Sequence, residues 1–102
     1  MTKKLLQINS RSSIPPEELR EEYEGAATPI SAVAGLEWKI FALNEETAEA
    51  AGIYLFKDAE SLQAYLDGPI MAAMKTKPAF SDVTVKVFDI AEEATLKTRG
   101  PV

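Results

Sequence analysis

Residues 36–56 decide the fold and read LEWKIFALNEETAEAAGIYLF. The alternation of side chains over residues 36–43 predicts one strand, and the Ile, Tyr, Leu and Phe residues within 51–56 predict another. The polar, acidic stretch of residues 44–49 between them is predicted to be a connecting loop.

Two more strands are predicted nearer the ends of the chain, over residues 3–10 and 82–90. In the first of these, Leu6 and Ile8 share one face, while Gln7 and Asn9 lie on the other. Each segment shows the period of two that is typical of strands.

Helical patterns fill the remaining segments. The first predicted helix starts after the Ser and Pro residues within 12–16 and ends at Gly35, and Pro29 should kink or divide it. The second starts at an Asp58 N-cap, and a short further helix opens at Pro69. The tail, residues 91–102, is expected to be loosely ordered or bound to a partner.

The predicted order is therefore β-α-β-β-α-β, the split pattern of ferredoxin-like α+β folds. Right-handed crossovers place both helical regions on one face of a four-stranded antiparallel sheet and leave its other face bare. We expect a single domain over residues 1–102, with its core at about 4–90.

The strands are apolar on both faces, although a half-solvated sheet should be polar on its outer face. Strict alternation separates Trp38 and Ile40 from Phe41 and Leu43. Our interpretation places Trp38 beneath the first helix and leaves Phe41, Leu43 and Phe88 on the bare face. Such a patch predicts a homodimer in which two sheets pack face to face and close a dimeric α+β barrel.

The composition excludes several classes of function. The chain has 102 residues and a net charge of −5, which argues against binding to nucleic acid or to anionic lipid. It contains no Cys and no His, so thiolate nucleophiles, disulfides and the commonest metal ligands are excluded. No apolar run is long enough for a signal peptide or a membrane span, and a cytoplasmic location is expected.

Residues 35–41 and 51–56 resemble the corresponding strands of the YdhR mono-oxygenase family, and the resemblance extends over about residues 4–90. It implies a dimeric α+β barrel related to aromatic mono-oxygenases that need no cofactor and to haem-degrading enzymes. The chain departs from this family before the first helix and at Asn9, where relatives can carry His. That departure puts chemistry that depends on His in doubt.

Three side chains are the expected catalytic residues: Trp38, Asn9 and Tyr54. Each could donate a hydrogen bond where negative charge develops on a substrate. Each also has a structural alternative. Trp38 could simply fill the core, Tyr54 could sit at a rim with its hydroxyl in water, and Asn9 could cap the turn after its strand.

Five further side chains are expected to contact substrate: Gln7, Tyr23, Lys39, Tyr65 and Met74. Lys39 could neutralise an enolate or a carboxylate in a cleft. The favoured alternative for Lys39 is an ion pair with an acidic neighbour, or a rim position, because an isolated buried lysine is costly. No metal site is expected.

The leading functional hypothesis is a mono-oxygenase without cofactor that acts on a hydroquinone or phenol in a pocket between sheet and helices. Without flavin or metal, the electrons for O₂ must come from the substrate. The alternative is a non-catalytic dimer that binds a small apolar ligand in the same cavity. A third possibility is a dimerisation domain with a filled core and no cavity.

Overall fold

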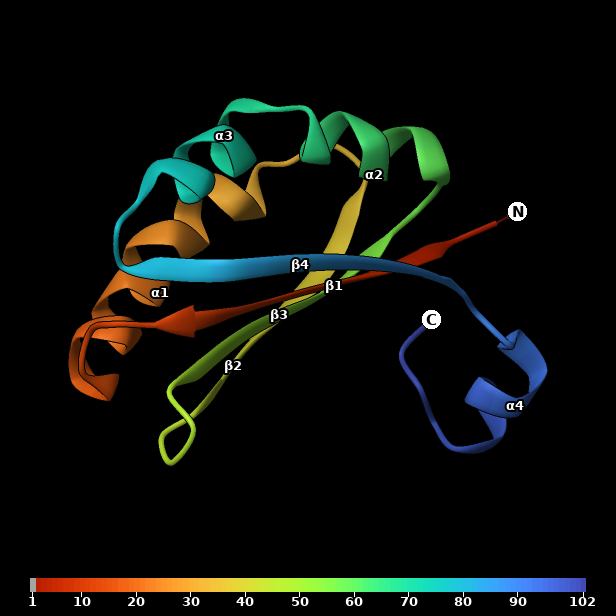
Figure 1. Ribbon diagram of the computed structural model, residues 1–102. Coiled ribbons are helices and arrows are strands. Elements are labelled where there is room, and N and C mark those ends of the chain that lie inside the picture. Colours follow the sequence, from red (N-terminus) through yellow and green to blue (C-terminus); the bar gives the residue numbers. More distant parts are fainter. Residues whose placement is uncertain (1) are drawn as a thin grey trace.

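A four-stranded antiparallel sheet with three helices on one of its faces forms the body of the protein in the computed structural model, which describes residues 2–102 (Figure 1). The elements in chain order are β1 (Lys4–Ser12), α1 (Pro16–Ser31), β2 (Leu36–Asn44), β3 (Glu49–Phe56), α2 (Ala59–Leu66), α3 (Pro69–Thr76), β4 (Phe80–Asp89) and α4 (Glu92–Lys97). The strand order β2-β3-β1-β4 confirms the ferredoxin-like α+β fold. No helix within residues 2–102 is long and apolar enough to cross a membrane.

Helix α1 is one continuous element, so the predicted division at Pro29 is wrong. Pro29 lies in the last turn of the helix, where it removes a single backbone donor. The helix ends at Ser31 rather than at Gly35. Gly35 instead makes the turn into β2 with a φ of 80°, in the left-handed region that glycine adopts without strain.

The second helical region begins as predicted. The Asp58 side chain accepts a hydrogen bond of 2.8 Å from the backbone N–H of Ser61 and so caps α2. Pro69 occupies the first turn of α3, where its missing N–H costs nothing.

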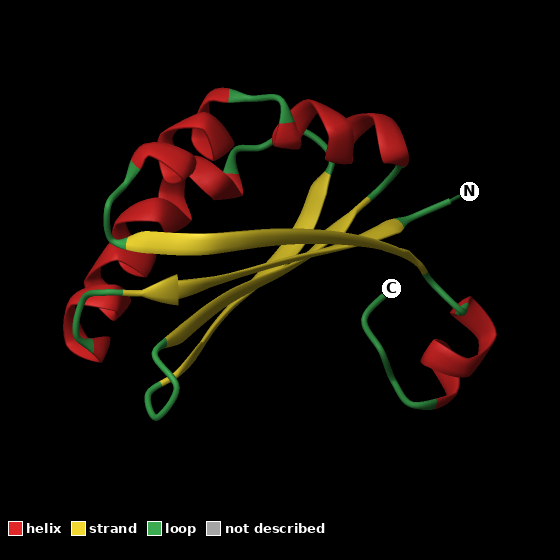
Figure 2. Cartoon of the chain, in the orientation of Figure 1, coloured by secondary structure: helices red, strands yellow, loops and turns green. Residues whose placement is uncertain are grey.

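The C-terminal segment is more ordered than the sequence predicts, because residues 92–97 form helix α4. Glu92 in the first turn and Lys97 in the last turn complement the helix dipole. The chain then folds back, and Trp38 Nε1 donates a hydrogen bond of 2.9 Å to the carbonyl oxygen of Pro101. Helix α4 and the C-terminus lie on the opposite side of the sheet from α1, α2 and α3 (Figures 1 and 2).

A β-bulge in β2 changes which side chains face the helices. Leu36 pairs with Phe56, but Trp38 pairs with the adjacent Leu55, so strand β2 contains one extra residue at this point. Strict alternation therefore fails between Leu36 and Trp38. Beyond the bulge, Lys39 pairs with Tyr54 of the buried face.

This register corrects two predictions. Phe41 lies on the helix-covered face with Leu43, not on the bare face, because Phe41 pairs with Gly52 and Leu43 with Ala50. Trp38 is not beneath α1 but on the opposite face. That face keeps apolar character, since Ile40 is 51% exposed and Phe88 is 44% exposed.

The hydrophobic core lies between the covered face and the helices. Its buried residues are Leu6, Ile8, Tyr54, Phe56, Leu62, Tyr65 and Met71. Leu6 and Ile8 of β1 contribute to it while Gln7 between them does not, which confirms the predicted alternation of that strand. Large side chains from α2, α3 and two strands thus fix these helices on the sheet.

The turn before β2 yields a direct test of this architecture. Gly35→Ala should lower the free energy of unfolding by about 2 kcal/mol, because a non-glycine residue is strained at positive φ and its Cβ would overlap the Ser61 side chain. Gly25→Ala is the matched control: its Cβ meets nothing within 4 Å, so it should stabilise helix α1 by about 0.5–1 kcal/mol. Urea denaturation measures both. Equal effects of the two substitutions would contradict this account of the turn.

Candidate active site

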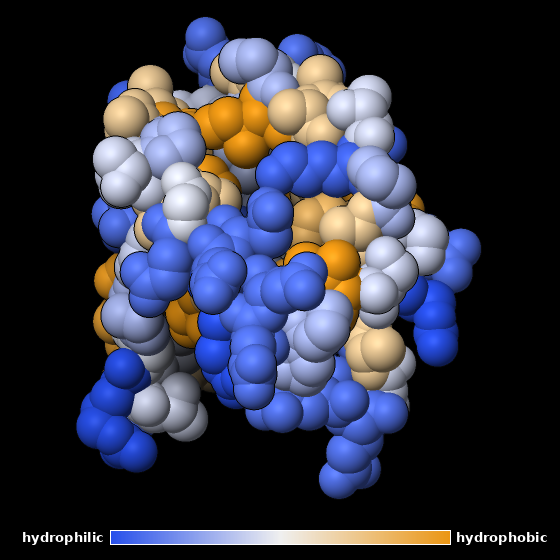
Figure 3. Space-filling model, turned by 90° about the vertical axis from the view of Figure 1, so that its left-hand side faces the viewer, coloured by the Kyte–Doolittle hydropathy of each residue, from blue (hydrophilic) through white to orange (hydrophobic). Residues whose placement is uncertain are grey.

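A cavity of about 770 Å³ lies between the covered face of the sheet and helices α1 and α3. Its floor is formed by side chains of β1, β2 and β3, and its walls by the two helices. On the side of the molecule shown in Figure 3, hydrophobic surface is visible between hydrophilic side chains. A cavity of this size is incompatible with the filled-core reading of the sequence.

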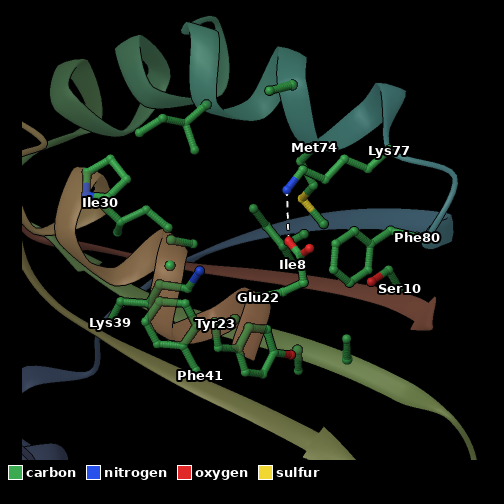
Figure 4. Close-up of a pocket in the computed structure, with 18 of the residues that line it drawn as sticks. Ile8, Ser10, Glu22, Tyr23, Ile30, Lys39, Phe41, Met74, Lys77 and Phe80 are labelled. Atoms are coloured by element: carbon green, nitrogen blue, oxygen red, sulfur yellow. Dashed lines mark hydrogen bonds and ion pairs between the residues drawn. The ribbon is translucent and has the colours of Figure 1, made fainter. Parts of the chain in front are cut away.

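Lys39 projects from β2 into this cavity beside aromatic rings (Figure 4). Its Nζ lies 3.9 Å from the centre of the Phe41 ring and 4.6 Å from the centre of the Tyr54 ring. Within residues 2–102 no carboxylate forms an ion pair with it, and Glu37 pairs with Lys3 instead. The favoured ion-pair prediction for Lys39 is therefore wrong.

The aromatic surroundings of Lys39 stabilise its cation only in part. A ring face attracts an ammonium group, but two rings do not replace the hydration that burial removes. Burial lowers the pKa of Lys39 from 10.5 to about 8. This lysine therefore changes its charge close to neutral pH.

Tyr54 of β3 and Tyr65 of α2 form a hydroxyl pair that lines the cavity. Their oxygens are 3.0 Å apart and their ring centres 5.2 Å apart. Burial raises the pKa of both hydroxyls above the ordinary value, so both stay protonated at neutral pH. Because each hydroxyl carries one proton and their mutual bond uses one, the pair keeps one donor for a ligand.

Tyr23 has a different role in the wall. Its hydroxyl donates a hydrogen bond of 2.6 Å to the carbonyl oxygen of Ala42, and its ring lies 5.0 Å from that of Phe41. Its only proton is thus used to tie α1 to β2. Burial raises the pKa of this hydroxyl as well.

Charged residues surround the opening of the cavity. Lys77, just after α3, donates a hydrogen bond of 2.9 Å to Glu22 of α1, as the dashed line in Figure 4 marks. This ion pair connects the two helices. Glu18 and Glu21 of α1 also line the cavity, so its α1 side is acidic.

Gly52 supplies the space that Lys39 needs. A Cβ at this position would lie 3.0 Å from Lys39 Cε and 3.0 Å from Tyr54 Cε1, closer than side chains normally approach. The sequence analysis did not identify Gly52, Phe41, Glu22 or Lys77 as site residues. A glycine inside a strand was the available signal for Gly52, since it often marks a close approach.

The structure divides the predicted site residues into two groups. Tyr23, Lys39, Tyr54, Tyr65 and Met74 line the cavity. The predicted residues Gln7, Asn9 and Trp38 do not line it. The expectation that Asn9, Trp38 and Tyr54 share one pocket is therefore wrong.

The reason for this division lies in the strands. Gln7 and Asn9 alternate with the buried Leu6 and Ile8, so they point to the other face of β1, where Gln7 Nε2 donates to Asn9 Oδ1 at 3.4 Å. The bulge places Trp38 on that same face. The catalytic roles assigned to Asn9 and Trp38 stay predictions. Within residues 2–102, no three His, Cys, Asp or Glu side chains converge as metal ligands.

The pKa of Lys39 predicts how stability depends on pH. Lys39→Met should raise the free energy of unfolding by about 1–3 kcal/mol at pH 7, because the folded protein then no longer buries a charge. Below about pH 8 the lysine is charged in both the folded and the unfolded chain, so the cost is complete. Above about pH 10.5 it is neutral in both, and the cost disappears.

Urea denaturation of both proteins between pH 7 and 11 measures this difference. The exposed Lys75 of α3 provides the control, and Lys75→Met should show no such dependence on pH. A constant advantage of Lys39→Met over the whole range would show that Lys39 is not a buried cation.

Comparisons with known proteins agree with this fold. Residues 5–101 match the family model described as "Putative mono-oxygenase ydhR". No curated protein gives a significant match.

Several solved structures share the architecture. SnoaB from Streptomyces nogalater, described as a cofactor-independent oxygenase, is 12% identical, with a TM-score of 0.73 over 90% of this chain and 96% of that chain. The NE2512 protein of unknown function from Nitrosomonas europaea is 22% identical, with a TM-score of 0.69 over 89% of this chain and 91% of that chain. A dimeric ferredoxin-like protein of unknown function from Thermobifida fusca is 14% identical, with a TM-score of 0.69 over 87% of this chain and 92% of that chain.

At these identities the solved structures show a common fold and no more. The family model shows membership of the family, because its match spans nearly all of the sequence. The chain belongs to the YdhR family.

Proposed function

We propose that the protein is a mono-oxygenase that uses no cofactor and oxidises a small hydroquinone or phenol in the cavity. The observation that carries this proposal is the ammonium group of Lys39, which faces the cavity without a carboxylate partner within residues 2–102. The family description and the likeness to a cofactor-independent oxygenase support the reaction class.

The shape and lining of the cavity favour a planar aromatic ligand. The rings of Tyr23, Phe41 and Tyr54 offer stacking surfaces, and Met74 gives an adaptable wall. The volume of about 770 Å³ accommodates a ligand of one or a few fused rings. A phenol hydroxyl directed at Lys39 would provide the negative charge that this ammonium group lacks.

Lys39 and the tyrosine pair would then act on the substrate in complementary ways. The ammonium group lowers the pKa of the bound phenol by stabilising its anion. The remaining proton of the Tyr54–Tyr65 pair donates a hydrogen bond to oxygen as it takes up charge. An ionised electron-rich ring is the reductant for O₂, and the protein holds it away from bulk water.

The overall reaction balances without an external reductant. A hydroquinone gives four electrons and becomes a hydroxyquinone, with one atom of O₂ forming the new carbon–oxygen bond. The other oxygen atom leaves as water, with two hydrogen atoms that come from the substrate.

A non-catalytic binding module is the second candidate function. Three of the cavity's polar side chains, Tyr23, Tyr54 and Tyr65, keep their protons at neutral pH because burial raises the pKa of each. Hydrogen bonding and stacking by these residues would suffice to hold an apolar phenol without turnover.

Oxygen consumption with a panel of hydroquinones distinguishes the two functions. The wild type should consume O₂ faster than the hydroquinone does alone, and one water should form per quinone. Lys39→Met should lower kcat/KM on the order of 100-fold, and Tyr54→Phe about tenfold, because each removes a partner of developing negative charge. The exposed Lys75→Met variant is the matched control.

Trp38→Phe and Asn9→Ala complete the experiment, because both residues lie on the other face of the sheet. If these two variants lose activity while Lys39→Met keeps it, the site is not the cavity. If phenols bind in the cavity but neither the wild type nor any variant consumes O₂, the protein is a binding module.

We also propose that the protein works as a homodimer. The face without α1–α3 exposes Ile40 and Phe88, at 51% and 44%, and these large apolar side chains lie on β2 and β4, the two edge strands of the sheet. A second copy that packs its own sheet face to face would cover them. The Thermobifida fusca protein with this fold is described as dimeric.

Light scattering during gel filtration tests this proposal. The wild type should elute as a dimer, and Ile40→Glu should weaken the dimer at least tenfold, because symmetry places two new charges in an apolar interface. Thr28→Glu adds the same charge to the exposed surface of α1 and should leave the dimer intact. A monomeric wild type at micromolar concentration would refute the dimer.

A further inference from the structure

We propose that Lys39 is a nucleophilic amine that captures aromatic aldehydes and ketones as imines within the cavity. The proposal rests on where this amine is placed. It extends from the floor of the cavity, between two aromatic rings, with the wall of α1 and α3 around it.

The first requirement for such a site is an amine that is not held by an acid. The four ion pairs within residues 2–102 engage Lys3, Lys4, Arg20 and Lys77, and none engages Lys39. Its surroundings are rings rather than carboxylates. A lysine desolvated among apolar groups is the usual form of an imine-forming lysine.

The second requirement is room beside the amine. Gly52 lies directly beneath the lysine stem, where any side chain would meet Lys39 Cε at 3.0 Å. The absence of a side chain at this position leaves the floor open next to the amine. A planar carbonyl compound can therefore approach while its ring rests against Phe41 or Tyr54.

The third requirement is an uncharged amine. Burial lowers the pKa of Lys39 to about 8, which leaves roughly one tenth of it neutral at pH 7. For an ordinary lysine with a pKa of 10.5, the neutral fraction at this pH would be roughly 300-fold smaller. The other titratable groups of the cavity are Lys77, three glutamates of α1 (Glu18, Glu21 and Glu22) and its three tyrosines.

The reaction needs no oxidant or reductant. The neutral nitrogen attacks the carbonyl carbon, a carbon–nitrogen bond forms and the carbonyl oxygen takes a proton. The carbon–oxygen bond then breaks as the carbon–nitrogen double bond forms, and the oxygen leaves as water after a second protonation. The nitrogen gives up two protons in the sequence, which balance the two that the oxygen takes up. The free donor of the Tyr54–Tyr65 pair lies in the same cavity and can supply a hydrogen bond to the departing oxygen.

This inference does not depend on the oxygenase proposal. Oxidation of phenols uses the charged form of Lys39, and imine formation uses its neutral form. The two functions can therefore fail separately. A protein that consumes no O₂ could still capture carbonyl compounds. A protein that captures no carbonyl compound could still consume O₂.

Reductive trapping provides the experiment. The full-length protein is treated at pH 7 with 4-hydroxybenzaldehyde and cyanoborohydride, which reduces an imine to a stable secondary amine. Peptide mass spectrometry then compares the rate of modification at Lys39 with that at the exposed Lys75. We expect Lys39 to react at least tenfold faster, with a rate that rises with pH to a plateau above about pH 8.

Two controls identify the cavity as the site. An excess of 4-methylphenol, which has the same ring without the carbonyl group, should protect Lys39 and leave Lys75 unaffected. Gly52→Val should likewise slow the modification of Lys39 and leave that of Lys75 unchanged. Modification of Lys39 at the rate of Lys75, or fast modification that 4-methylphenol does not suppress, would overturn the proposal.

Discussion

The β-bulge between Leu36 and Trp38 determines which side chains of β2 face the helices. A regular strand that starts with Leu36 in the core would turn Trp38 toward the helices and Lys39 toward the other face. The extra residue reverses this arrangement beyond the bulge. A single local irregularity thus places an ammonium group among aromatic rings and moves the large indole to the opposite side.

The reversal gives the two faces of the sheet different roles. The helix-covered face holds a cavity in which Lys39 lies among aromatic rings, while three glutamates of α1 and Lys77 line its opening. The opposite face carries the C-terminal segment, held by Trp38, and leaves Ile40 and Phe88 exposed. The proposed ligand site and the proposed dimer interface therefore lie on opposite faces of one sheet.

Local patterns were sufficient to predict most of the fold. The strands, the Asp58 cap and the Pro69 helix start follow from side-chain period and from backbone chemistry, which act within a few residues. The face of each β2 side chain did not follow, because a bulge depends on pairing with β3 and leaves no clear mark in the sequence. Lys39 was therefore recognised as a site residue but expected to be ion-paired, and Trp38 was assigned to the wrong face. The pairing of β2 with β3, and not the composition of β2, determines which face each side chain occupies.

The proposed chemistry of the cavity depends on Lys39 being a partly buried cation without a carboxylate partner within residues 2–102. The most direct measurement is its titration by NMR, after reductive ¹³C-methylation of the lysines and assignment through a Lys39→Arg variant. The structure predicts a midpoint near pH 8 for Lys39, which shifts upward when a phenolate ligand binds beside it. A midpoint near 10.5 that no phenol changes would mean that the amine lies in water, and the cavity would lose its central group.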